Sequence, residues 1–77
     1  MNKRISVKQN SSDFTNAYTV TETVDYGAGV VETNVFTVHT GPTGNGLWIN
    51  GVQVEGNSQF SAGARPGEAI RRYFQKS

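Results

Sequence analysis

Cysteine is absent from this 77-residue sequence, and its absence removes two ways of stabilising a small domain. Neither a disulfide framework nor a thiolate metal site can form, although small secreted domains commonly depend on such cross-links. We therefore expect a protein of the reducing cytoplasm. The sequence also lacks a run of about 20 apolar residues that could cross a membrane and an apolar signal segment after its basic start. A soluble protein without a membrane partner is predicted.

Basic residues are missing from most of the chain. No Lys or Arg lies between Gln9 and Ala64, whereas three lie in the first eight residues and four in the last thirteen. The middle of the chain carries five acidic residues instead, so we expect a mildly acidic sheet between two basic ends, with a net charge of only +1. The basic residues that could form a patch for phosphate groups are Lys3, Arg4, Lys8, Arg65, Arg71 and Arg72.

Histidine occurs once, which excludes much catalytic chemistry. A Ser/His/Asp hydrolase needs a histidine base, and no nucleophile motif accompanies His39. A metal site would need scattered carboxylates that lack the spacing of a calcium loop. The glycine-rich residues 40–46 lack the Gly-Lys-Ser/Thr of a phosphate-binding loop and precede a strand pattern, not a helix. We predict no catalytic residues, no metal, no cofactor and no enzymatic activity.

The patterns that are present indicate β-strands. Residues 4–9 alternate apolar and polar side chains, and residues 14–26 form a longer alternating run rich in threonine, valine and aromatics. Glycines at 27 and 29 favour a three-residue turn into a further strand, which pairs Tyr26 with Val30 and Val20 with Phe36.

The turn end of this first hairpin is polar. Its pairing places Glu22 and Glu32 on the face that is apolar further from the turn. Two close carboxylates could act as an acid/base pair, but a solvated surface is the better interpretation. We therefore expect this end of the hairpin to project beyond the core.

A second hairpin is predicted around Asn50-Gly51, a strong signal for a two-residue type I′ turn. Pairing across it places Leu47, Ile49, Val52 and Val54 in one apolar block and Trp48 on the opposite face. Trp48 then either packs with Phe60 in a second small cluster or stays exposed for a partner. The sequence leaves both alternatives open.

The last thirteen residues predict a helix that begins at Pro66. Its apolar stripe consists of Ala69, Ile70, Tyr73 and Phe74. So short a helix is marginal in water, so the stripe must pack on the apolar face of the sheet. The sequence thus predicts one small α+β domain over residues 1–77: an antiparallel sheet of four or five strands, built from two hairpins, with one C-terminal helix packed on one face.

These features favour a small, non-enzymatic protein-interaction module. In size, and in its lack of catalytic residues, the chain is similar to the stand-alone proteins with which phages and bacteria inhibit or modulate larger complexes. A homodimer is one form that it could take. The partner-binding residues that we predict are Trp48, Glu22, Asp25, Glu32, Thr43 and Asn45, with residues 41–46 as a mobile loop. The alternative is a nucleic-acid-binding accessory protein that uses the six basic residues named above and stacks Trp48 on bases.

Overall fold

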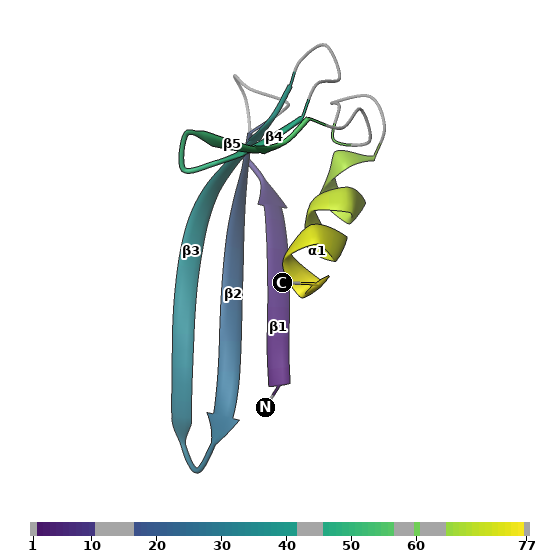
Figure 1. Ribbon diagram of the computed structural model, residues 1–77. Helices are drawn as coiled ribbons and strands as arrows, with labels where there is room; N and C mark the ends of the chain where they lie inside the picture. The colour runs from purple at the N-terminus through teal and green to yellow at the C-terminus, as the bar shows by residue number, and fades with distance from the viewer. Residues whose placement is uncertain (1, 11–16, 42–45, 57–59, 61–64, 77) are drawn as a thin grey trace.

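The computed structural model describes residues 2–10, 17–41, 46–56, 60 and 65–76. Its elements are β1 (Asn2–Gln9), β2 (Ala17–Gly27), β3 (Val30–Thr40), β4 (Leu47–Ile49), β5 (Val52–Glu55) and α1 (Pro66–Lys76). The five strands form one antiparallel sheet in the order β1-β2-β3-β4-β5, and α1 packs against β1 (Figure 1). The α+β architecture expected from the sequence is confirmed.

The β2–β3 hairpin has the predicted register over most of its length, with Val20 opposite Phe36. The pairing of Tyr26 with Val30 is wrong, because Gly27 lies opposite Val30 and a bulge follows Asp25. The physical reason is the turn itself. It contains only Ala28 and Gly29, both with positive φ (53° and 80°), as two-residue hairpin turns with the twist of the strands require. The bulge accommodates the extra residue.

The core lies between α1 and one face of the sheet. Its buried side chains are Ile5, Tyr18, Val20, Val38, Leu47, Phe60, Ala69, Ile70 and Phe74. The apolar stripe predicted for the helix is therefore confirmed as the layer that packs on the sheet, with Tyr73 partly buried at its margin. The ring of Phe36 lies 5.1 Å from that of Phe74, so the helix also contacts β3 at this point.

Hydrogen bonds from Arg71 and Lys3 join α1 to β1. The guanidinium of Arg71 donates through Nη1 to the carbonyl of Ile5 at 2.7 Å. Nζ of Lys3 donates to the carbonyl of Phe74 at 2.8 Å, one of the last four helical carbonyls, which have no partner within a helix. A cation at this end also complements the helix dipole.

The helix begins at Pro66 and carries Glu68 in its first turn. Both residue types are favoured at these positions of a helix.

The apolar block predicted for the second hairpin is only half formed. Leu47 is fully buried and Ile49 packs against the core, but Val52 and Val54 are 64% and 39% exposed. Leu47 lies opposite Glu55, because a bulge shifts the register after Trp48–Gln53. The prediction for Val52 and Val54 is wrong because α1 packs on β1, at the opposite edge of the sheet from β5.

The turn end of the β2–β3 hairpin extends well past the C-terminal end of α1 (Figure 1). The molecule is accordingly elongated, with principal extents of 44 × 24 × 20 Å. The projecting hairpin expected from the polar residues near its turn is confirmed.

Among the described residues no helix is long and apolar enough to cross a membrane.

We predict that Ile70→Ala lowers the free energy of unfolding by about 2–5 kcal/mol, the usual result of emptying a filled core position, because Ile70 is fully buried under the sheet. The matched control is Val52→Ala, at the exposed valine of β5, which should change stability by less than about 1 kcal/mol. Urea denaturation followed by Trp48 fluorescence measures both. Equal losses in the two variants would contradict the placement of the core.

Candidate protein-interaction surface

Much of β3 has a strand on one side only. It pairs with β2 from Val30 to His39, but β4 pairs only with its last three residues, Val38–Thr40. The preceding residue, Thr37, bonds to the turn of the second hairpin. The N–H of Thr37 donates to Oδ1 of Asn50 at 3.0 Å, and the N–H of Asn50 donates to the carbonyl of Thr37 at 2.7 Å. Residues 30–36 have no strand beside them in the part of the chain described, and we call them the open β3 edge.

The backbone direction along the open β3 edge follows from Thr37. Its N–H and carbonyl point away from β2, toward Asn50. In an antiparallel ladder alternate residues bond to the same neighbour, so the N–H and carbonyl groups of Val35, Thr33 and Val31 point the same way. These three alternate residues therefore present backbone donors and acceptors to a strand placed beside the edge.

The side chains on the open β3 edge are unusually apolar for an exposed strand. Val30, Val31 and Val35 are 57%, 55% and 63% exposed. Sheet edges that stay unpaired usually carry lysine, proline or bulges that discourage pairing, and this edge has no Lys or Arg because none occurs between Gln9 and Ala64. The open β3 edge is therefore suited to accept a strand.

The opposite edge of the sheet is built differently. β1 carries Lys3, Arg4 and Lys8, and the guanidinium of Arg71 occupies the outward carbonyl of Ile5. Charged side chains and a covering helix are common means by which proteins block an edge strand. Of the two long strands β1 and β3, the part of the chain that the structure describes blocks the edge of β1 and leaves residues 30–36 of β3 open.

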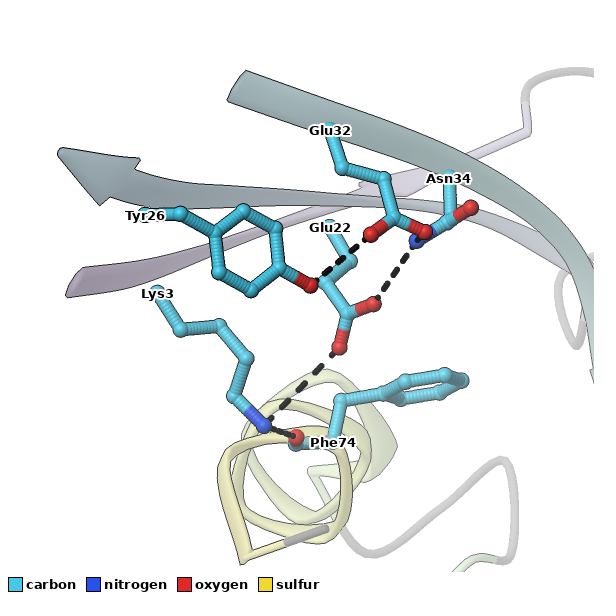
Figure 2. A network of polar contacts seen from close by, with 6 residues as sticks. All are labelled: Lys3, Glu22, Tyr26, Glu32, Asn34 and Phe74. Atoms are coloured by element: carbon cyan, nitrogen blue, oxygen red, sulfur yellow. Dashed lines mark hydrogen bonds and ion pairs between the residues drawn. The ribbon is translucent and has the colours of Figure 1, made fainter. Parts of the chain in front are cut away.

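A polar network lies on the α1 face beside the open β3 edge (Figure 2). Nδ2 of Asn34 donates to Oε1 of Glu22 at 3.1 Å and to Oε2 of Glu32 at 3.2 Å, so one amide bridges both carboxylates. The hydroxyl of Tyr26 donates to Oε1 of Glu32 at 2.8 Å. Nζ of Lys3 lies 3.8 Å from Oε2 of Glu22. We call these five residues the polar network.

The polar network favours the charged form of Glu32. The hydrogen bond from Tyr26, and after it the bond from Asn34, lowers the pKa of Glu32. Conversely, the bond to Glu32 and the negative charge of that residue raise the pKa of Tyr26. A general acid at neutral pH needs a raised carboxyl pKa, so Glu32 is not tuned for that role. The arrangement provides a fixed acidic surface.

The predicted partner-binding residues are only partly brought together. Glu22 and Glu32 meet in the polar network, whereas Asp25 is exposed near the turn, where its Oδ1 accepts a bond from the N–H of Gly27 at 2.9 Å. Thr43 and Asn45 lie outside the described residues, as does most of the predicted loop at 41–46.

Trp48 lies on the face away from α1 and is partly buried, opposite His39 on β3 and Gln53 on β5. Phe60 belongs instead to the core beside α1, where its ring meets that of Tyr73 edge to face at 6.3 Å. The alternative in which Trp48 packs with Phe60 is therefore wrong, because Phe60 lies in the core on the α1 face and Trp48 lies on the other face of the sheet. Trp48 has intermediate exposure on that face.

The six basic residues do not share one face. Lys3 and Arg71 bond to the helix end and to β1. By strand alternation Arg4 and Lys8 lie on the sheet face away from α1, while Arg65 and Arg72 are exposed, Arg65 just before the helix and Arg72 on its outer side.

The described residues contain no group of three or more His, Cys, Asp or Glu side chains that could hold a metal ion.

Sequence reasoning missed Val30, Val31, Thr33 and Val35 as functional candidates. The signal that could have found them is a difference in strand length: the β3 pattern runs for eleven residues and the β4 pattern for three. A three-residue strand cannot cover a neighbour of eleven residues, so most of β3 has to remain open unless another segment covers it.

Comparison with protein family models, with curated proteins and with solved structures gave no match to this chain. The function is therefore inferred from the geometry of the chain itself.

We predict that Tyr26→Phe raises the pKa of Glu32, because the substitution removes the hydrogen bond that contributes most to lowering it. The lowered pKa stabilises the fold above the ordinary glutamate pKa of about 4.3, and this stabilisation is lost as the pH falls through the folded-state value. Carboxyl-detected NMR titration measures the change. The control Tyr73→Phe removes a hydroxyl from the margin of the core and should leave the titration of Glu32 unaltered. An unchanged Glu32 titration in Tyr26→Phe would show that the bond does not form in solution.

Proposed function

We propose that the chain is a non-enzymatic protein-interaction module that binds an extended segment of a protein at the open β3 edge. The observation that carries the proposal is the coincidence, at residues 30–36, of outward backbone groups with three exposed valines. A strand added at such an edge gains main-chain hydrogen bonds, and its alternate side chains contact those of the edge.

The energies show which parts of the surface must take part. Two backbone groups on each of Val31, Thr33 and Val35 offer six hydrogen bonds, each with a net contribution of about 1 kcal/mol. Association costs an estimated 4–15 kcal/mol, so the backbone bonds alone give little affinity. The valine side chains must be covered as well, at up to about 1.5–3 kcal/mol for complete burial of each. A partner with apolar residues opposite the valines is therefore favoured.

The acidic residues flank the open β3 edge on both faces of the sheet. Glu32 belongs to β3 itself and faces α1 with the rest of the polar network. Asp25 lies directly opposite Val31 on β2, on the other face. We propose that these residues select partners by charge, because like charges placed opposite one another in a sheet destabilise pairing. Trp48 contributes an aromatic contact further along the uncovered face.

The non-enzymatic part of the proposal is supported by the surroundings of the single histidine. His39 is exposed, and its cross-strand neighbours are Ala17 and Trp48, which carry no nucleophile. A histidine base needs a nucleophile within hydrogen-bond reach. The hydrogen bonds of Glu32 lower its pKa and favour its charged form, which suits recognition better than proton transfer.

We predict that a photoreactive residue at position 33 captures a protein partner from a lysate of the source organism, and that Val35→Lys weakens binding of the purified partner at least tenfold, or about 1.4 kcal/mol. The lysine would disturb the apolar contacts of the added strand. Val52→Lys is the matched control, because Val52 and Val35 are equally exposed, at 64% and 63%, and lie on different strands. Isothermal titration calorimetry measures both affinities.

Equal weakening by the two lysines would place the contact elsewhere than on β3. A separate titration with single- and double-stranded oligonucleotides, followed by Trp48 fluorescence, should show no binding. Binding that weakens steeply with salt would overturn the proposal in favour of a nucleic-acid partner held by phosphate contacts.

A further inference from the structure

The open β3 edge is complementary to itself. We infer that it pairs with the same edge of a second copy of this chain, antiparallel about a two-fold axis at Thr33. This inference rests on the proposed function and names the partner of the same surface. Two-fold dimers use one patch on both subunits, so the patch must suit its own reversed image. Both the backbone and the side chains of residues 30–36 meet that condition.

The backbone permits one favourable register. Residues 31, 33 and 35 point outward, so an antiparallel partner must place its own outward residues opposite them. With Thr33 opposite Thr33 of the second copy, all three residues form hydrogen-bonded pairs. The register centred on residue 32 would place Val35 opposite Gly29 of the second copy, in the turn. The register centred on residue 34 would place Val31 opposite Thr37 of the second copy, whose backbone groups already bond to Asn50.

The side chains agree with this register. On the sheet face away from α1, Val31 lies opposite Val35 of the second copy, and the same pair recurs on the other side of the two-fold axis. On the α1 face, Glu32 lies opposite Asn34, an amide that already donates to carboxylates within its own chain. Such apolar and hydrogen-bonding pairs stabilise neighbouring strands. The shifted register centred on residue 32 would instead oppose two Glu32 carboxylates.

The remaining exposed valine completes the match. Val30 is 57% exposed, and the register places it opposite Phe36 of the second copy, which packs on Phe74 at the margin of the core. Pairing therefore gives each of the three exposed valines of the edge an apolar neighbour on the second copy. The product is a continuous sheet across both copies, with the two α1 helices on the same face.

The β1 edge cannot form the equivalent dimer. Antiparallel self-pairing there would bring together two sets of Lys3, Arg4 and Lys8, and like charges on facing strands repel. The bond from Arg71 to the carbonyl of Ile5 also occupies an outward acceptor in the middle of the strand. Self-pairing through β1 is therefore disfavoured, and pairing through the open β3 edge uses the same patch on both subunits, which gives a closed dimer.

The register is tested by disulfide formation, because the natural chain has no cysteine to interfere. In the proposed dimer the two residues at position 33 form a hydrogen-bonded pair with Cα atoms about 5.5 Å apart, within the range that disulfides bridge. Thr33→Cys should therefore give a covalent dimer under mild oxidation. Val35→Cys alone should stay uncross-linked, because its two copies lie four residues apart along the strand, about 13 Å.

An equimolar mixture of Val31→Cys and Val35→Cys should cross-link as a mixed dimer, since these positions face one another across the axis. Non-reducing electrophoresis and mass spectrometry of the linked peptides give the result. Cross-linking of Val35→Cys to itself as fast as that of Thr33→Cys would overturn the register, and a monomeric Thr33→Cys protein would overturn the dimer.

Introducing a charged residue at position 33 provides an independent measurement that does not rely on oxidation. Thr33→Lys and Thr33→Glu each place like charges face to face at the axis, so each variant should raise the dimer dissociation constant at least tenfold in sedimentation equilibrium. Mixing the two should restore dimers, because a lysine then faces a glutamate. The control Val52→Lys, at an exposed valine of β5, should sediment as the wild type does.

The two proposals fail in different ways. If the purified wild type sediments as a monomer at every concentration while position 33 still captures another protein from the lysate, the second copy is not the occupant but the open β3 edge remains an interaction surface. If position 33 captures neither itself nor another protein, both proposals are wrong.

Discussion

The two-residue turn at Asn50-Gly51 limits how far the sheet can extend beside β3. The turn follows Ile49 directly, so β4 ends after three residues, and the Asn50 side chain and backbone bond to Thr37. These bonds fix the place where pairing with β4 stops, while the ladder with β2 sets which backbone groups further along β3 point outward. The length of the candidate surface thus depends on one asparagine that lies outside it.

The first hairpin was predictable because each of its features is local. Alternating side chains show which residues share a face, and glycines beside the turn limit the register to one or two choices. The second hairpin shows where this reasoning ends. Alternation correctly places Leu47 and Ile49 on one face, but the exposure of Val52 and Val54 depends on where a helix about ten residues further along the chain comes to pack. That position depends on tertiary packing, which periodicity does not encode.

The candidate site was predictable in its charges and not in its edge. Glu22 and Glu32 share a face, as cross-strand pairing requires, but their link to Lys3 and to the end of α1 joins residues from opposite ends of the chain. The open β3 edge depends on how far neighbouring strands overlap, a property of the whole sheet. The side-chain chemistry of Trp48 alone makes it a candidate contact, whereas the valines of β3 have the sequence pattern of ordinary strand residues and differ only in their exposure.

The bonds from Lys3 to Phe74 and from Arg71 to Ile5 have a consequence for synthesis on the ribosome. α1 follows all five strands in the chain, so a nascent sheet has to wait for the helix with its apolar face uncovered and β1 not yet blocked. During that interval both edges and one face are open to other chains, and unpaired edges of this kind favour aggregation. The docking of α1 is therefore the step that ends this exposure.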